Sequence, residues 1–190
     1  KSVLYLIVLY GFSVAQAGSY EDFFAAVRSD DAGSVTALVA RGFDANVRDT
    51  DGQHALHLAL RQKAFKVIGA LLGWSKIDVE PRNKADESPL MLAALDGEAD
   101  LVKRLVVMGA DVNKPGWAPL HYAATRGHLD IMAYLLDQNA YIDAASPNGT
   151  TPLMMAAFYG TPSAVKLLLA AGADPMLKNT QGLSAIDFAQ

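Results

Sequence analysis

One segment recurs along this chain at intervals of 30 to 34 residues, and this recurrence restricts the possible folds more than any other feature. The stretch APLHYAATRGHLDIMAYLLDQNAYID (118–143) has close counterparts in SPLMLAALDGEADLVKRLVVMGADVN (88–113) and TPLMMAAFYGTPSAVKLLLAAGADP (151–175). Weaker copies start near Ala55 and Ala185. A repeat of this length is one supersecondary unit that cannot bury its apolar face alone, so successive units must stack on one another. The sequence therefore predicts a stacked-repeat protein.

Each copy contains signals that start and end two short helices. Ser88-Pro89 and Thr151-Pro152 place a hydroxyl at the N-cap, where it accepts an orphan backbone N–H, and proline at the first helical position. Apolar residues spaced by three and four then indicate a second helix in each copy. Both helices are predicted to end at a residue in the left-handed conformation. These residues are Gly97, Gly127 and Gly160 for the first helices, and Gly42, Gly109, Asn139 and Gly172 for the second helices.

The order of these signals resembles the ankyrin repeat, in which a TPLH start, paired alanines and a G-H pair precede an apolar helix and a GADVN-like loop. The resemblance extends from about Tyr20 to Gln190. It implies an all-α repeat solenoid, a stack of helix-turn-helix units joined by β-hairpin loops. It divides the chain into a partial capping repeat (18–48), four repeats (49–82, 83–115, 116–145 and 146–178) and a truncated repeat (179–190). Because residues 179–190 supply only a first helix, Ile186 and Phe188 should lack part of their cover, and we expect the chain to be a fragment.

The copies depart from the pattern at two places. In the repeat 49–82, Lys63 stands at the position of the mid-repeat glycine. The hairpin before Ala118-Pro119 is three residues short, and Ala118 lacks the hydroxyl that caps the other first helices. Replacing Ala118 by threonine should therefore stabilise the fold by roughly 0.5–1 kcal/mol.

The N-terminal segment 1–17 follows a different plan from the repeats. Lys1 precedes an apolar run to about Val14, and Ala15-Gln16-Ala17 supplies the small residues of a cleavage site. This plan is typical of a signal peptide, with cleavage predicted after Ala17. As a helix, the run from Val3 to Ala17 would reach only ~22 Å, whereas the hydrocarbon core of a bilayer is about 30 Å thick. We therefore expect export, to a bacterial periplasm in preference to secretion from a eukaryotic cell.

The composition argues against several function classes. The 190 residues carry a formal charge of −4 and no basic stripe, so nucleic acid is not an expected partner. There is no cysteine, which excludes disulfides and a lipid-anchored bacterial lipoprotein. No phosphate-binding loop, nucleophile elbow in the repeats or HExxH zinc motif occurs. We expect a chain that is not an enzyme and that needs no cofactor, metal or small-molecule substrate.

The histidines invite a metal-site hypothesis, but the resemblance gives them a structural role. His57 and His121 occupy the histidine position of the TPLH start, which implies that each imidazole hydrogen-bonds the backbone of a loop. His128 fills the G-H position after a first helix, and no carboxylates show metal-ligand spacing around these rings. The stretch Asp49-Thr50-Asp51-Gly52 lacks the further oxygen ligands of a calcium loop and is interpreted as a turn.

What remains is the recognition of another protein. The resemblance implies contacts from the ends of the first helices and from the hairpin tips, which repeat stacks present as an extended surface. The first-helix candidates are Arg61, Gln62, Leu95, Asp96, Thr125, Arg126, Phe158 and Tyr159. The hairpin candidates are Gln53, Glu87, Trp117, Asn148 and Thr150.

Three aromatic candidates have both a binding and a packing interpretation. Trp and Tyr are frequent energetic anchors of protein interfaces, which favours Trp117 and the Phe158-Tyr159 pair as contacts. Trp117 could equally cover the shortened hairpin, and Tyr159 could pack against the next repeat.

The predicted function is thus a non-catalytic, exported, monomeric protein-interaction module. Two alternatives remain open. One is a membrane-tethered scaffold in which residues 1–17 are retained as an anchor, and the other is a protein whose catalytic domain lies beyond Gln190.

Overall fold

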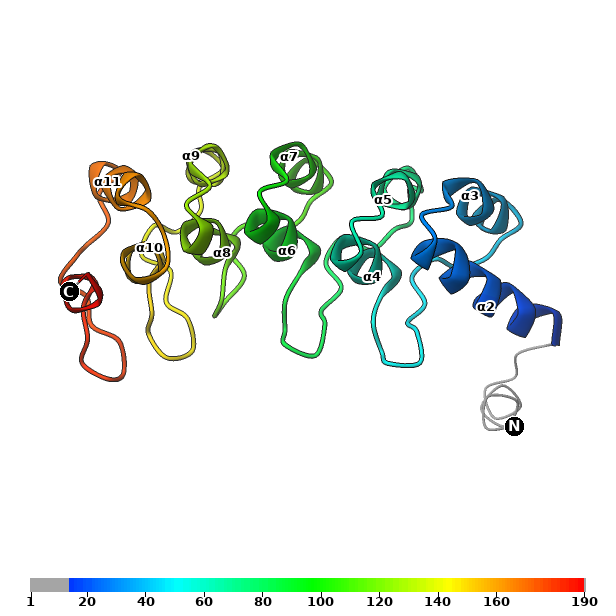
Figure 1. Cartoon of the computed structure of the whole chain (residues 1–190), viewed down its shortest axis with the longest axis horizontal. Coiled ribbons are helices and arrows are strands. Elements are labelled where there is room, and N and C mark those ends of the chain that lie inside the picture. Colours follow the sequence, from blue (N-terminus) through cyan, green and yellow to red (C-terminus); the bar gives the residue numbers. More distant parts are fainter. Residues whose placement is uncertain (1–13, 190) are drawn as a thin grey trace. The chain divides into compact units, whose positions relative to one another are not determined.

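The computed structural model describes residues 14–189, which form short helices connected by turns and loops (Figure 1). The chain divides into two compact units, residues 1–84 and 85–190. The helices of the first unit are α2 (Val14–Arg28), α3 (Ala32–Ala40), α4 (Ala55–Arg61) and α5 (Phe65–Leu71). Those of the second unit are α6 (Pro89–Asp96), α7 (Ala99–Val107), α8 (Pro119–Arg126), α9 (Leu129–Asp137), α10 (Pro152–Phe158), α11 (Pro162–Ala170) and α12 (Ala185–Phe188).

The helices of the second unit are arranged in two rows (Figure 1). Each first helix packs against the second helix of its own repeat, α6 on α7, α8 on α9 and α10 on α11. Along one row α6 contacts α8, α8 contacts α10 and α10 contacts α12, and along the other α9 contacts both α7 and α11. This arrangement confirms the predicted stack of helix-turn-helix units.

Pairs of alanine allow the first helices of the second unit to pack closely. Ala93 and Ala94 on α6 and Ala123 and Ala124 on α8 have no exposed surface. Large apolar side chains fill the remaining space, and burying each of them contributes about 1.5–3 kcal/mol. The fully buried ones include Leu90, Met91, Leu105, Leu120, Ile131, Met132 and Leu135.

The first unit is built around the end of α2. Helix α2 packs against α3 and α4, and α5 contacts both of these helices. Phe23 is fully buried, and its ring centroid lies 4.7 Å from that of Phe43. The Tyr20 hydroxyl donates a hydrogen bond of 2.6 Å to the Arg48 carbonyl, which ties α2 to the following hairpin.

The predicted signal segment lies largely outside the described residues. Residues 1–13 are not among them, and Val14 to Ala17 belong to the first turns of α2. The helices of the described part are all too short or too polar to cross a lipid bilayer.

The helix ends follow the predicted capping chemistry at most positions. The hydroxyls of Ser88 and Thr151 accept the backbone N–H groups three residues later, each at 3.3 Å. Glycine or asparagine adopts a positive φ at the predicted positions Gly42, Gly97, Gly109, Gly127, Asn139 and Gly172. Lys63 also has a positive φ, 55°, so it occupies without glycine a conformation that glycine adopts more easily.

Gly160 is the exception, and the prediction of a left-handed residue there is wrong. Helix α10 is capped by Tyr159 with a φ of −114°, and Gly160 does not have a positive φ. Glycine is needed at this position because another chain segment is close. A Cβ atom on Gly160 would lie 2.5 Å from the Ala124 carbonyl oxygen and 2.8 Å from that of Ala156.

An aspartate begins most of the loops that follow the second helices. Its Oδ1 accepts the backbone N–H two residues later at 2.7–2.9 Å, in Asp44–Asn46, Asp78–Glu80, Asp111–Asn113 and Asp174–Met176. In the loop after α9, Tyr141 occupies this position. The third loop residue then links neighbouring repeats. Asn113 accepts the Tyr141 N–H at 2.7 Å and donates to the Asn139 carbonyl at 2.8 Å.

Three hairpin tips share one turn geometry, at residues 49–53, 146–150 and 179–183. In each, the first N–H donates to the fifth carbonyl at 2.8–3.0 Å, and a glycine N–H donates to the first carbonyl at 2.8–2.9 Å. Asp49 Oδ1 accepts N–H groups of Asp51 and Gln53, so it serves the turn, as the sequence suggested. These hairpins contain no regular strand within the described residues, where an isolated antiparallel bridge joins Arg48 to His54.

Candidate functional site

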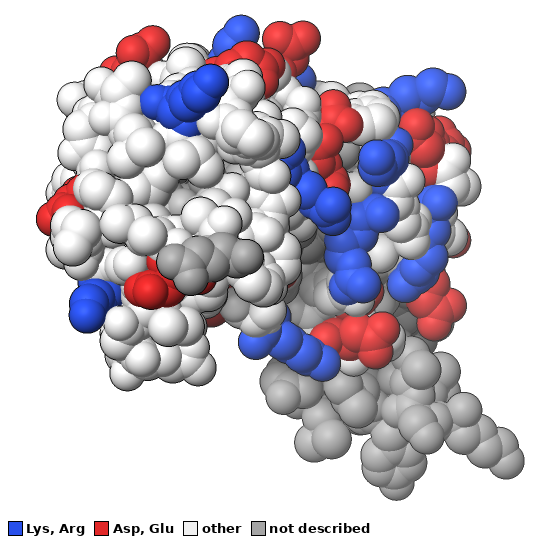
Figure 2. All heavy atoms as spheres, turned by 60° about the vertical axis from the view of Figure 1, so that its left-hand side comes forward, with Lys and Arg blue, Asp and Glu red and all other residues white. Residues whose placement is uncertain are grey.

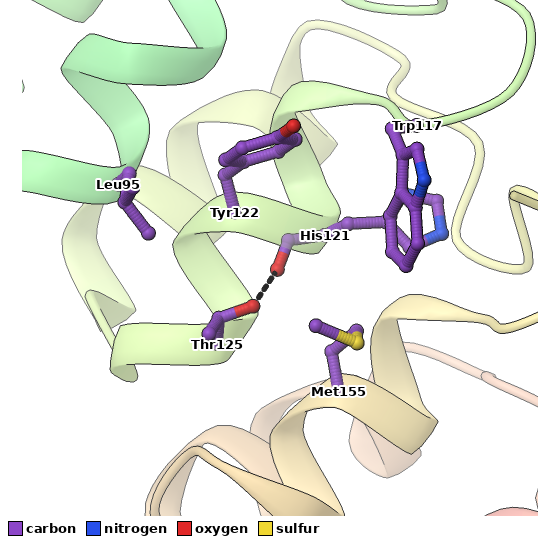
Figure 3. A pocket seen from close by; sticks show the side chains of 6 residues that line it. All are labelled: Leu95, Trp117, His121, Tyr122, Thr125 and Met155. Carbon is purple, nitrogen blue, oxygen red and sulfur yellow. Dashed lines mark hydrogen bonds between the residues drawn. The ribbon is translucent and has the colours of Figure 1, made fainter. Parts of the chain in front are cut away.

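A hollow of about 210 Å³ opens on the second unit between its first helices and the shortened hairpin (Figure 3). We use the term first-helix face for the exposed side of α6, α8 and α10 together with the adjoining hairpins. The residues that line the hollow are Leu95 on α6, Trp117 in the hairpin, His121, Tyr122 and Thr125 on α8, and Met155 on α10.

The shortened hairpin holds Trp117 at one end of the hollow. The indole ring meets the His121 ring edge to face, with centroids 5.2 Å apart and planes at 74°. Lys114, which is buried, donates to the Pro115 carbonyl at 3.1 Å and forms an ion pair with Asp86. Trp117 is half-buried, so it packs on the repeat and also lines the hollow (Figure 3).

His121 is a structural residue in the floor of the hollow. Its Nδ1 accepts the Ala118 N–H at 3.1 Å, and its Nε2 lies 2.9 Å from the Thr150 carbonyl oxygen. Because a carbonyl can only accept, Nε2 carries the proton and the ring is neutral. Burial lowers the pKa of His121, which favours the same neutral form. The predicted bond from this imidazole to loop backbone is therefore present.

Two other histidines, His128 and His54, also contact backbone groups. His128 Nε2 lies 3.0 Å from the Leu95 carbonyl oxygen, and His54 caps α4 by accepting the Leu56 N–H on Nδ1 at 3.2 Å. Burial lowers the pKa of His54 to about 4, with smaller effects from the neighbouring His57. Among the described residues, no three His, Cys, Asp or Glu side chains are grouped in a way that could hold a metal ion.

Tyr122 gives the hollow its polar edge. Its hydroxyl donates to Glu87 Oε1 at 3.0 Å, which connects α8 to the hairpin that precedes α6. Burial raises the pKa of Tyr122, and the nearby carboxylates of Glu87 and Asp86 raise this pKa further. The phenol therefore stays protonated and remains a hydrogen-bond donor to Glu87.

The rest of the lining is apolar. The Thr125 hydroxyl donates to the His121 carbonyl at 2.7 Å (Figure 3), so this polar atom is used within α8. Leu95 and Met155 contribute apolar side chains from the two neighbouring first helices. A hollow with these walls favours an apolar group over a polar one, because a polar group would lose water without gaining a partner.

Four of the predicted contact residues lie at this hollow or its edge, and the others lie elsewhere on the chain. Glu87, Leu95, Trp117 and Thr125 lie there. Phe158 and Tyr159, at the end of α10, are 56% and 61% exposed. The remaining exposed candidates in the second unit are Asp96, Arg126 and Asn148.

Thr150 requires a correction, because it is buried. Only 6% of its surface is exposed, its N–H donates to Ser146 Oγ at 2.9 Å, and its carbonyl accepts from His121. It holds the hairpin to the helix instead of facing a partner.

The first-unit candidates form a separate group. Arg61 and Gln62 are exposed at the end of α4, and Arg61 Nη1 donates to Gln53 Oε1 at 3.1 Å. This bond connects the helix end to the hairpin tip within one repeat.

Two residues that line the hollow, Tyr122 and Met155, were not among the predicted contacts, although helical spacing points to both. Tyr122 and Met155 each lie three residues before a predicted contact, Thr125 and Phe158 respectively. Residues at i and i+3 share one face of a helix. Extending each predicted contact by one turn toward the helix N-terminus would have found both.

The end of α10 adjoins a surface with few charges. Figure 2, in which the C-terminal side comes forward, shows mainly uncharged side chains in this region. Its large exposed apolar residues include Phe158, Tyr159, Leu183 and Ile186. The Phe158 ring contacts both Tyr159 and Phe188, with centroids 4.4 and 5.5 Å apart. Ile186 on α12 is 50% exposed.

Comparison with known proteins identifies the family. The model of ankyrin repeats (3 copies) matches residues 23–115 and 90–179, so the chain belongs to the ankyrin-repeat family. It is 31% identical over 153 residues to the nuclear factor NF-kappa-B p105 subunit of Mus musculus, covering 77% of the chain and 16% of that protein. It is 32% identical over 152 residues to the B-cell lymphoma 3 protein homolog of Mus musculus, covering 76% of the chain and 34% of that protein.

The family match establishes a protein-interaction module. Ankyrin-repeat proteins are in general non-catalytic, although the repeats also occur in multi-domain enzymes. The tyrosine-protein kinase Shark of Drosophila melanogaster is 31% identical over 149 residues, which cover 76% of the chain and 16% of the kinase. The chain therefore spans a sixth to a third of the length of these relatives.

Proposed function

We propose that this chain binds a partner protein through the first-helix face of its second unit, by complementarity of shape and without catalysis. The observation that carries the proposal is the hollow between α6, α8 and α10, which is continued by exposed aromatic side chains. Met155 on α10 lines the hollow, and Phe158 and Tyr159 follow at the C-terminal end of the same helix. Phe158 and Tyr159 are more than half exposed, and exposed aromatics beside a concave apolar site are typical of interface anchors.

The test compares two sets of exposed aromatic residues. The double variant Phe158→Ala and Tyr159→Ala should weaken partner binding by more than ~2 kcal/mol if these residues are anchors. Tyr141→Ala is the matched control, because Tyr141 is 66% exposed but lies on a loop after a second helix. Proteins captured by the native chain and by Tyr141→Ala, but not by the double variant, are the expected partners. Equal capture by all three folded chains would remove these aromatics from the interface.

We further propose that the chain is exported, with residues 1–17 removed as a signal peptide. The support is the order of charge, apolar run and A-x-A residues in the sequence. Expression in an exporting host followed by mass spectrometry of the intact protein should give a chain that starts at Gly18. A chain that retains residues 1–17 in the membrane fraction would instead support a tethered scaffold.

A further inference from the structure

The chemistry of the hollow restricts the partner, provided that the proposed binding surface is correct. The polar atoms on its floor are already used. Both ring nitrogens of His121 have backbone partners, and the Thr125 hydroxyl donates within α8. A group that enters between Leu95, Trp117 and Met155 therefore meets apolar atoms and aromatic rings (Figure 3).

The size of the hollow fits one large side chain. Its volume of about 210 Å³ exceeds the ~150 Å³ of an apolar cavity that accepts benzene. Leucine, methionine and phenylalanine have the size and polarity to enter. The inserted side chain would displace water from the surroundings of Trp117 and Met155, and each CH₂ group removed from water favours binding.

The carboxylates of Glu87 and Asp86 lie at the edge of the hollow, in the hairpin that precedes α6. Glu87 and Asp86 contribute two negative charges, and Lys114 contributes one positive charge through its ion pair with Asp86, so the three together carry −1. Lys114 is buried, whereas Glu87 is half-exposed at the surface. A cation on the partner therefore meets a carboxylate here, and the Tyr122 hydroxyl holds that carboxylate in place.

Beyond the hollow, the first-helix face continues along the row formed by α6, α8 and α10. Leu95, Thr125 and Phe158 occupy equivalent positions in α6, α8 and α10, and each of these helices contacts the next. A compact small molecule would occupy the hollow alone, whereas an extended chain segment can reach the hollow and also Phe158. This continuity favours a peptide segment as the occupant.

We propose that the first-helix face binds an extended peptide segment in which a leucine, methionine or phenylalanine side chain enters the hollow and a neighbouring lysine or arginine pairs with Glu87. The segment belongs to the partner protein. Its apolar residue supplies most of the affinity, and its basic residue sets the register along the row of helices.

The test uses selection from a random peptide library displayed on phage, with the full chain as the target. The selected peptides should contain a large apolar residue next to lysine or arginine. Synthetic fluorescent copies should lose at least tenfold in affinity when the apolar residue is changed to alanine. Changing the basic residue to glutamate should also weaken binding, and the loss should shrink as salt is raised.

Two variants of the chain separate the apolar and ionic contacts. Thr125→Phe fills the hollow without a charge change and should weaken binding at least tenfold. Thr36→Phe is its control, because the hydroxyl of Thr36 also donates to the carbonyl four residues earlier at 2.7 Å, but Thr36 is exposed on a helix away from the hollow, whereas Thr125 is half-buried in its lining. Glu87→Gln can retain the bond from Tyr122 and should reduce the preference for lysine over glutamine in the peptide by about two- to fivefold.

Glu87→Lys provides the sharper test, since selection on this variant should yield aspartate or glutamate beside the apolar residue. Peptides selected without an apolar residue, or bound equally by Thr125→Phe with the fold intact, would overturn the proposal. Binding of free indole or benzene without any peptide selection would overturn it in favour of a small-molecule site. A third outcome separates this inference from the proposed function. If the Phe158→Ala and Tyr159→Ala double variant abolishes partner capture but substitutions of Thr125 and Glu87 leave peptide binding unchanged, the proposed function stands and this inference is wrong.

Discussion

At the scale of single residues, Gly160 and Gly69 show that glycines in different repeats have different surroundings. A Cβ on Gly160 would meet two carbonyl oxygens within 2.8 Å, whereas a Cβ on Gly69, inside α5, would meet no atom within 4 Å. Gly160→Ala should therefore destabilise the fold by about 1–3 kcal/mol through overpacking. Gly69→Ala should stabilise it by about 0.5–1 kcal/mol, because glycine loses more entropy in a helix. Urea unfolding measures the change in the free energy of unfolding for each variant. A Gly160→Ala variant that is more stable than the native chain would contradict the close approach of the Ala124 carbonyl to position 160.

The cap of α8 gives a second prediction at this scale. Ala118 makes no side-chain cap bond, whereas Ser88 and Thr151 at the equivalent positions accept an N–H at 3.3 Å. Ala118→Thr should raise the free energy of unfolding by roughly 0.5–1 kcal/mol. The site is buried, but so are Ser88 and Thr151, so the hydroxyl has room in the equivalent repeats. A thermal melt without any gain would mean that the short hairpin leaves too little space for the new side chain.

At the scale of elements, the loops after the second helices determine how one repeat is joined to the next. Four of these loops start with an aspartate that accepts the N–H two residues later, and Tyr141 interrupts the series. Tyr141→Asp should add this bond to the N–H of Asp143 and stabilise the fold by about 0.5–1.5 kcal/mol. Chemical denaturation measures the gain. Tyr141→Asn serves as the control that keeps an acceptor without adding charge, and a loss of stability in both variants would show that the tyrosine ring packs on the loop.

The helices and loops also differ in how well the sequence predicted them. Repeat boundaries, caps and most left-handed positions could be predicted because each depends on a few adjacent residues. The hollow could only be predicted in part. Leu95 and Thr125 lie on different helices, and Tyr122 reaches Glu87 across 35 residues of chain. Thr150 was predicted to be an exposed contact residue because the sequence of its turn does not show that its carbonyl accepts a hydrogen bond from His121.

At the scale of the whole molecule, buried neutral histidines make stability depend on pH. Burial lowers the pKa of His54 to about 4 from an ordinary value of 6.5 and also lowers the pKa of His121. The unfolded chain therefore binds more protons than the folded chain below pH 6.5, so stability falls as the pH drops from about 6.5 toward 4. The contribution of His54 to this loss is on the order of 3 kcal/mol.

Unfolding by urea at several pH values between 7 and 4 measures this slope. His54→Thr is the informative variant, because threonine can cap α4 as Thr151 caps α10 and does not titrate. The variant should show a shallower dependence on pH below 6.5. An unchanged slope would assign the effect to other groups.

The amino-acid sequence alone determined the class of this protein, since its period, its caps and its apolar spacing are local and are repeated several times along the chain. Tertiary structure decided what the repeats present to a partner. Neighbouring helices bring Leu95, Thr125 and Met155 around one hollow, and a close approach to α8 dictates the glycine at position 160. The physical reason is that local signals fix the backbone of each unit, whereas the shape of a binding surface depends on distances between side chains of different units.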